Sequence, residues 1–196
     1  MNLLVAVLAF AGAVVDLSAA ELASAQRGAI PVRTETFNQP SGKAAGRGMG
    51  AVVVDRPLPE VWAVLTRFED KAEYMPRLKS VTVLERQPGR LRVRMVVDAS
   101  VLTTRYTAWY TMDQSAWTLS WNLDASAPDN GIIGAQGAYR LQSLGPQRTL
   151  VLYHGFVDSG RKVPRFIQDY MTRKSIPDVL RAIKSRVESD GRWRRR

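Results

Sequence analysis

The middle of the chain alternates hydrophobic and polar residues with a period of two, which is typical of strands that bury one face. Six such segments are separated by short runs of Pro, Gly, Asp, Asn and Ser that favour turns. The segments are 78–86, 91–97, 102–112, 117–123, 134–144 and 149–157. A run of β-branched residues at 49–55 predicts one more strand ahead of them. Because the connections are short, we expect consecutive strands to pair as an antiparallel meander.

Two short helices are predicted between the first strand and the meander. Pro59 and Glu60 suit the first turn of a helix, where a missing N–H donor is tolerated and the helix dipole favours a negative charge. Apolar residues with helical spacing then predict one buried face, formed by Val61, Trp62, Leu65 and Phe68. A second short helix is predicted over 69–76, closing before Pro76.

The last predicted element is a long amphipathic helix over 163–189. Its apolar residues recur every three or four positions and define a single face, formed by Phe166, Ile167, Tyr170, Met171, Ile176, Leu180, Ile183 and Val187. We expect Pro177 to kink or split this helix, because proline lacks the N–H donor and crowds the preceding turn. The pattern therefore predicts an α+β domain over 49–189, in which six to seven antiparallel strands face one long helix.

Residues 1–48 precede this domain and have a different pattern. An uncharged apolar run of 13 residues (3–15) is followed by Ala23-Ser24-Ala25, which predicts a signal peptide over 1–25 that is cleaved before Gln26. No Lys or Arg precedes the run, which is atypical, and a retained N-terminal helix or membrane anchor is the alternative. Residues 26–48 are rich in Gly and Pro and predict a flexible arm. We therefore expect an exported protein, periplasmic or extracellular.

Several local motifs resemble those of one protein superfamily. Segments 52–57 (VVVDRP) and 59–65 (PEVWAVL) resemble the opening strand and first helix of START-like proteins. Segments 74–76 (YMP) and 81–84 (VTVL) resemble the end of the second helix and the next strand, and 137–141 (GAYRL) with 148–153 (RTLVLY) resembles the closing hairpin. The chain is thus similar, over about 49–189, to the START-like, polyketide cyclase/dehydrase (SRPBCC, helix-grip) superfamily, and most similar to bacterial coenzyme-Q-binding START-like proteins.

This resemblance implies a helix-grip fold, in which a curved antiparallel sheet wraps around the long C-terminal helix. It also implies an apolar cavity between the sheet and that helix. The ligands of such cavities range over quinones, sterols, phospholipids and polyketides.

The residue composition excludes several kinds of chemistry. The chain has no cysteine, so it has no disulfide, no thiolate nucleophile and no cysteine-based metal site. Its single histidine, His154, cannot form the imidazole cluster of catalytic zinc and many iron sites. The sequence contains no P-loop, nucleophile elbow or dinucleotide-binding fingerprint. We expect no metal and no cofactor.

The net charge of +10 favours partners that carry phosphate, such as nucleic acid or an anionic lipid surface. The predicted leader and the lack of a nucleic-acid recognition motif favour the lipid surface and not nucleic acid. A basic tail at 190–196 combines four arginines with Trp193, a composition that suits docking on an anionic membrane. A disordered, solubilising tail is the alternative.

Six side chains are predicted to bind the ligand: Trp121, Tyr139, His154, Phe156, Phe166 and Tyr170. The periodicity of the strands and the helix aims several of these rings at one space, although each ring could equally be part of the core. A period of two places His154 opposite Tyr153 in facing, and a purely structural histidine is the alternative to a role in the site. No residue is assigned to catalysis.

These observations together predict a carrier or binding protein for a hydrophobic small molecule or lipid. We expect a monomer that holds its ligand between the sheet and the last helix, near an anionic membrane surface. The alternative is a polyketide cyclase/dehydrase that acts in the same cavity. That enzyme would require polar acid–base groups that point into the cavity.

Overall fold

The computed structural model describes residues 17–38, 44–98, 103–158 and 165–195, and within these ranges it omits the side chains of 35–38, 44–46 and 165–173. The strands are β1 (Val32–Asn38), β2 (Ala44–Val54), β3 (Leu78–Gln87), β4 (Arg90–Asp98), β5 (Thr103–Asp113), β6 (Thr118–Leu123), β7 (Gly134–Gly145) and β8 (Arg148–Asp158). The helices are α1 (Ala19–Gln26), α2 (Leu58–Thr66), α3 (Lys71–Tyr74) and α4 (Arg165–Glu188). The expected α+β architecture is confirmed.

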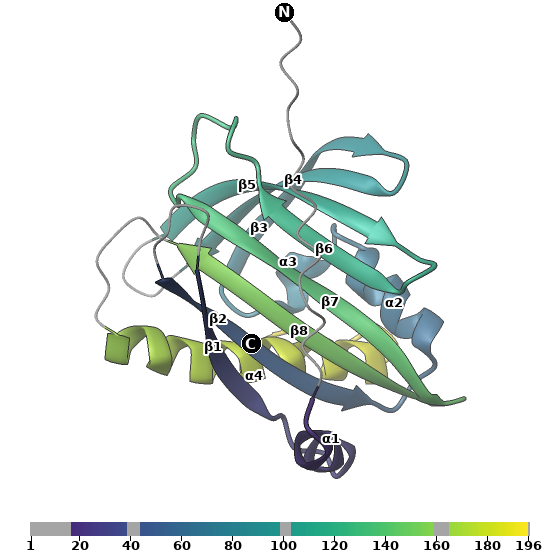
Figure 1. Cartoon of the computed structure of the whole chain (residues 1–196). Helices are drawn as coiled ribbons and strands as arrows, with labels where there is room; N and C mark the ends of the chain where they lie inside the picture. Colours follow the sequence, from purple (N-terminus) through teal and green to yellow (C-terminus); the bar gives the residue numbers. More distant parts are fainter. Residues whose placement is uncertain (1–16, 39–43, 99–102, 159–164, 196) are drawn as a thin grey trace, which may run out of the picture.

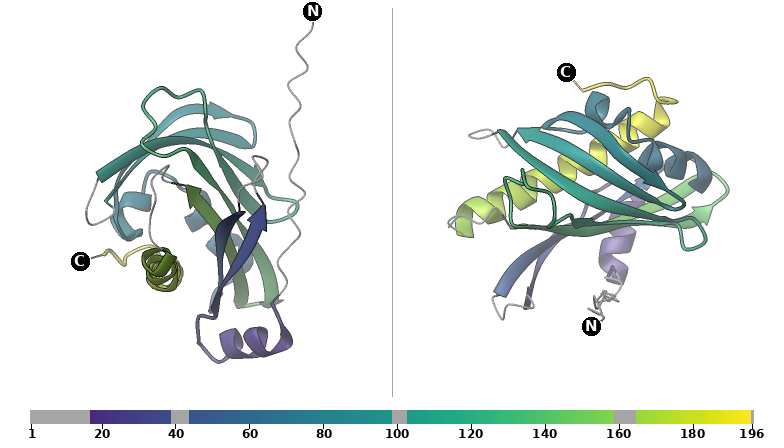
Figure 2. Two further views of the ribbon diagram at one scale, coloured as in Figure 1. Left: turned by 60° about the vertical axis from the view of Figure 1, so that its left-hand side comes forward. Right: turned by 90° about the horizontal axis from the view of Figure 1, so that it is seen from above.

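The strands form one antiparallel sheet in the order β1-β2-β8-β7-β6-β5-β4-β3. The meander from β3 to β8 pairs in sequence, and β2 then closes against β8, from Gly48 opposite Gly155 to Val54 opposite Thr149. The sheet curves around α4, which lies along its concave face, while α2 and α3 lie near the C-terminal end of α4 (Figures 1 and 2). No helix among the described residues is long and apolar enough to cross a membrane.

The apolar face of α4 packs on β2. Ile176, Leu180 and Ile183 are buried there, and the helix comes so close that a Cβ added at Gly50 would lie 2.7 Å from Ile176 Cγ2. Pro177 does not split α4, which runs unbroken from Arg165 to Glu188. Proline inside a helix costs about 3 kcal/mol, and the burial of three neighbouring aliphatic side chains, at roughly 1.5–3 kcal/mol each, offsets that cost.

The N-terminal segment differs from the predicted flexible arm. Residues 32–38 form the edge strand β1, which pairs with β2 from Val32 opposite Gly50 to Asn38 opposite Ala44. The sheet therefore has eight described strands where the pattern predicted six to seven, and it begins well before residue 49. The glycines at 46, 48 and 50 suggested a loop, but they lie within β2, and at Gly50 the helix α4 approaches closely.

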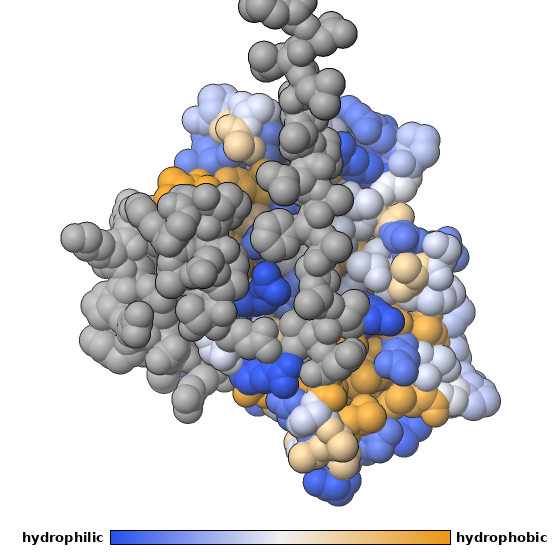
Figure 3. Space-filling model, viewed as in Figure 1, coloured by the Kyte–Doolittle hydropathy of each residue, from blue (hydrophilic) through white to orange (hydrophobic). Residues whose placement is uncertain are grey.

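Helix α1 covers part of the outer face of the sheet. Ser18 and Glu21 form a capping box at its start, and Ala25 is fully buried against Ala51, Val53 and Leu150. Hydrophobic residues gather on this outer face near α1 (Figure 3). The predicted cleavage site thus lies within a helix that packs on the domain. Residues 1–16 lie outside the described residues, so cleavage and export stay predictions.

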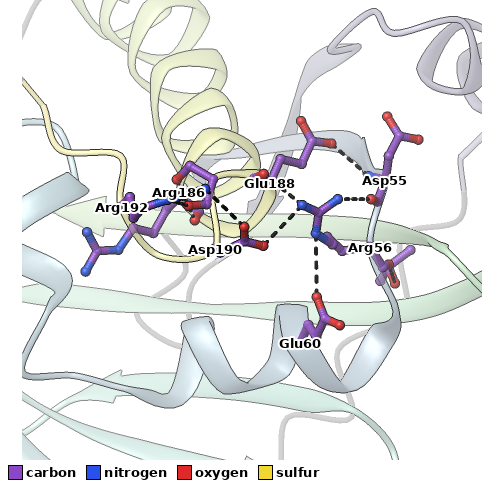
Figure 4. Close-up of polar contacts among 9 residues, drawn as sticks. Asp55, Arg56, Glu60, Arg186, Glu188, Asp190 and Arg192 are labelled. Atoms are coloured by element: carbon purple, nitrogen blue, oxygen red, sulfur yellow. Dashed lines mark hydrogen bonds and ion pairs between the residues drawn. The ribbon is translucent and has the colours of Figure 1, made fainter.

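The C-terminal residues fold back onto the domain. The backbone N–H of Arg195 donates to Glu73 O at 3.0 Å, and the Arg195 guanidinium donates to Met75 O at 2.9 Å. On the other side of α4, Arg56 joins Asp190 and Glu60, while Glu188 accepts a hydrogen bond from the backbone of Asp55 (Figure 4). The described part of the basic tail is therefore attached to the fold by specific contacts.

Candidate functional site

A group of aromatic rings lies on the concave face of the sheet, beneath α4. Residues paired directly across an antiparallel sheet point to the same face, and Tyr153 is paired with both Gly50, which touches α4, and Tyr139. Trp121 lies beside them. The centre of its ring is 5.5 Å from that of Tyr139, 6.0 Å from that of Tyr153 and 6.0 Å from that of Tyr110. The structure thus brings together two of the six predicted residues, Trp121 and Tyr139.

Two glycines make room for these rings. Gly137 and Gly155 face each other across β7 and β8. A Cβ at Gly137 would lie 2.7 Å from Trp121 Cη2, and one at Gly155 would lie 2.8 Å from Tyr153 Cζ. The indole of Trp121 and the phenol of Tyr153 therefore lie flat over glycine backbone. A side chain at either position would push a ring out of the cluster.

The cluster is only partly sealed. Tyr110 and Tyr139 are buried, whereas Trp121, Tyr153 and Tyr106 keep part of their surface accessible. By strand register these three rings lie on the concave face of the sheet, the face on which α4 packs. The exposed fraction of the side chains on this face increases along β8, from the partly buried Tyr153 to Val157, which is 65% exposed. This end of the concave face is the best candidate for a ligand site.

The phenol groups in the cluster are polar but not ionised at neutral pH. Desolvation raises the pKa of Tyr106 to about 12, and it raises the pKa values of Tyr110, Tyr139 and Tyr153 well above their usual range. The hydroxyls of Tyr106 and Tyr110 each donate to Met95 Sδ at 3.4 Å, and thioether sulfur is a weak acceptor. The site therefore offers neutral hydroxyl donors in apolar surroundings, which suits an uncharged or weakly polar ligand body.

His154 and Phe156 do not join this cluster. His154 is paired with Met49 and Ala138, and Phe156 with Gln136, so both side chains point to the outer face of the sheet. The strand alternates, and the residues that reach the concave face are Tyr153 and Gly155 instead. Burial and the positive charge of Arg47 lower the pKa of His154 below its ordinary value. The structure thus separates these two predicted residues from Trp121 and Tyr139.

Phe166 and Tyr170 lie in the first half of α4, but their side chains are outside the described part of the structure. The local pattern did not single out Tyr153, Tyr106 and Tyr110 as ligand-binding residues, although all three alternate onto the concave face from β5 and β8. The pairing of strands was the missing information, because it decides which of two adjacent aromatic residues shares a face with Trp121.

A hollow of about 310 Å³ lies away from these rings, where α2 and α3 meet the end of α4. It is lined by Val64, Arg67, Asp70, Glu73, Tyr74, Arg186, Asp190, Gly191 and Arg194. Its charges neutralise one another: Arg186, almost fully buried, binds Glu73 at 2.8 Å, and Arg194 binds the same carboxylate at 3.1 Å. This hollow serves to attach the C-terminal residues. No cluster of three or more potential metal ligands occurs among the described residues.

Comparison with known proteins agrees with this geometry. Residues 54–183 match the family described as polyketide cyclase / dehydrase and lipid transport. No curated protein matches the chain. Because the matched region is most of the chain, the protein belongs to this family, and the START-like superfamily expected from its motifs is confirmed.

Solved structures show the same fold at low sequence identity. The STAR-related lipid transfer protein from Xanthomonas axonopodis has a TM-score of 0.69 at 15% identity, covering 81% of this chain and 93% of its own. Human StAR-related lipid transfer protein 5 has a TM-score of 0.68 at 13% identity, covering 83% of both chains. The Zhui aromatase/cyclase from Streptomyces sp. R1128 has a TM-score of 0.63 at 22% identity, covering 83% of this chain and 97% of its own.

Proposed function

We propose that this protein is a carrier that holds a hydrophobic small molecule or lipid between the concave face of the sheet and α4. The observation that carries this proposal is the row of partly accessible aromatic rings beneath α4, around Trp121 and Tyr153. Rings that were only core would be expected to be sealed, as Tyr110 and Tyr139 are. The family description, which names lipid transport, agrees with this function.

The rim of the candidate site also suits exchange with a membrane. Ile133 is 70% exposed and Val157 is 65% exposed, and the two lie close together because the N–H of Ile133 donates to Asp158 O at 2.9 Å. Exposed aliphatic side chains beside an apolar site favour contact with lipid. The proposed mechanism is that the first half of α4 moves away, the ligand passes from the bilayer to the rings, and the helix returns.

The proposed contact between the basic tail and an anionic membrane involves fewer residues than the whole of 190–196. Arg194 and Arg195 are occupied by Glu73 and by Met75 O within the protein. The side chain of Arg192 is 81% exposed, with an ion pair only to the neighbouring Asp190 at 3.3 Å among the described residues, and Trp193 is 37% exposed. We propose that these two residues, and not the whole tail, are available to a lipid surface. Export to the periplasm or the extracellular space is likewise part of the proposal, motivated by the apolar run at 3–15.

The carrier proposal predicts a co-purifying hydrophobic molecule and a localised binding defect. Native mass spectrometry followed by organic extraction should identify the molecule. Trp121→Ala should then weaken its binding about tenfold, because a ring contact contributes about 0.5–1.5 kcal/mol beyond its buried area. His154→Ala is the matched control: it also removes a ring from the same region of the sheet, but from the opposite face, and should leave binding within several-fold of wild type. Equal losses in both variants would contradict the proposed site.

The cyclase alternative is favoured by the family description, which also names polyketide cyclase / dehydrase, and by the fold shared with the aromatase/cyclase from Streptomyces. Such an enzyme would need a proton donor in the site, and Tyr139 is a buried tyrosine whose ring packs against both Trp121 and Tyr153. Tyr139→Phe keeps the ring and removes the hydroxyl. Conversion of the co-purified ligand by wild type, reduced a hundredfold or so in Tyr139→Phe with binding unchanged, would replace the carrier proposal by the enzyme.

A further inference from the structure

A lysine is buried near α3 and the C-terminal end of α4, and its amine has no polar partner among the described residues. Lys71, at the start of α3, is 3% exposed, and its ammonium group lies over the ring of Phe68, whose centre is 4.7 Å from Nζ. The structure gives Nζ no hydrogen bond or ion pair among the described residues. A buried ammonium without a partner costs several kcal/mol, so such a side chain is rarely kept for stability alone.

The charged groups around Lys71 are already paired with others. The carboxylates beside it on α3 are those of Asp70 and Glu73, which are bound by Arg67, Arg186 and Arg194. The side chain facing α3 from α4 is that of Arg186, also a cation. Strand β3, which α3 contacts, presents Lys79, Glu85 and Arg86, all exposed and engaged in surface contacts. The carboxylate of Glu69, two residues before Lys71, is bound by Arg86. Among the described residues, the carboxylates near Lys71 are thus all paired with other cations.

Lys71 lies next to the aromatic cluster. The ring of Phe68, which Nζ touches, packs edge-to-face against Tyr110 at 4.7 Å, and Tyr110 in turn stacks on Trp121 at 6.0 Å. Nζ is not among the completely enclosed polar atoms that lack a partner. Nζ therefore keeps a small accessible surface. Burial lowers the pKa of Lys71 to about 7, so the amine can take up a proton when an anion arrives.

We propose that Lys71 is the polar anchor of the ligand site, and that the ligand carries an acidic oxygen group, such as a carboxylate, at one end of its hydrophobic body. The hydrophobic body lies along Trp121, Tyr139 and Tyr153, and the acidic oxygen accepts a hydrogen bond from Lys71 Nζ. This inference rests on the proposed carrier function and specifies the class of its ligand. The unpartnered ammonium supplies the charge, and the ligand supplies the acceptor that the protein lacks.

The test compares three probes of equal chain length: dodecanoic acid, methyl dodecanoate and dodecan-1-ol. Binding to the full chain is measured by calorimetry at pH 7.5 for wild type, Lys71→Met and Lys79→Met. Wild type should bind the acid about 10- to 100-fold more tightly than the ester or the alcohol, as expected for a charge-assisted hydrogen bond. Lys71→Met should lose this preference and still bind the alcohol. Lys79→Met, which changes an exposed lysine, should keep the preference.

The other outcomes separate the two proposals. If wild type and Lys71→Met bind all three probes equally, Lys71 does not anchor the ligand, while the carrier function stands. The same holds if both proteins prefer the acid to the same extent. If no probe binds to either protein, the carrier function fails for linear hydrophobic molecules, and the inference about Lys71 fails with it.

Discussion

Replacing Lys71 by methionine should stabilise the protein, by an amount that depends on pH. Methionine has a similar length and no charge, so it fills the same space without the desolvation cost. Burial lowers the pKa of Lys71 from its ordinary value of 10.5 to about 7. Each pH unit of that difference corresponds to about 1.4 kcal/mol, so the cost of keeping the lysine approaches roughly 5 kcal/mol when its amine is charged.

The sign of the pH dependence follows from where the protons bind. Between pH 7 and 10.5 the unfolded chain keeps a proton on this lysine and the folded chain does not, so the wild-type free energy of unfolding rises with pH. Below pH 7 both states are protonated and the full cost is present. The advantage of Lys71→Met should therefore be largest below pH 7 and should shrink by about 1.4 kcal/mol per pH unit above it.

Urea unfolding between pH 6 and 9.5 measures this difference, below the range in which unfolded tyrosines ionise. Lys79→Met is the control, because the side chain of Lys79 is 52% exposed and pairs with Asp98 at 3.1 Å. Its stability relative to wild type should change little with pH. A constant difference between Lys71→Met and wild type over the whole range, or a loss of stability in Lys71→Met, would refute the argument that an unpartnered ammonium is buried there.

Three further predictions concern the packing of the site and the two termini. Gly137→Ala should lower stability by about 1–3 kcal/mol in thermal unfolding, since its Cβ would collide with Trp121 and with the backbone of β8. The control is Gly134→Ala, whose Cβ would lie 3.2 Å from Phe156. Gly28→Ala is unsuitable as a control because Gly28 has a positive φ. Deleting 192–196 should lower stability by about 1–2 kcal/mol, because it removes the hydrogen bonds to Glu73 and Met75; unchanged melting would mean that the tail is not attached in solution. Expression in a bacterium with the leader intact should yield exported protein that begins at Gln26, and intact-mass analysis that finds only uncleaved cytoplasmic protein would contradict export.

Cleavage of the predicted leader would change the outer face of the sheet. Cleavage before Gln26 would remove Ala25 from the cluster that it forms with Ala51, Val53 and Leu150. Leu17 and Leu22, which pack on the same cluster, would leave with it. The mature protein would then expose this apolar area on the outer face of the sheet. Binding of a hydrophobic dye to the cleaved form, compared with the full chain, would detect that change.

Much of the fold could be predicted because the meander has short connections and strict alternation. All six predicted strands from 78 to 157 occur within a residue or two of their expected bounds, and the last helix occupies most of the range predicted for it. The pairing of β1 with β2 was missed because it depends on an edge interaction and not on a local pattern. The glycines of β2 suggested flexibility, and only the approach of α4 to Gly50 explains them as packing positions.

The candidate site illustrates the same division. Local periodicity was enough to place aromatic residues on strands and to restrict each to one of two faces. Which face lies beneath α4 depends on strand register, and register joins Trp121, Tyr139 and Tyr153 while it sends His154 and Phe156 to the other side. The burial of Lys71 depends on tertiary packing and not on strand register. Nothing in the local pattern distinguishes it from the exposed Lys79, and only the packing of α3 against its neighbours removes its amine from water and leaves it without an acid to bind.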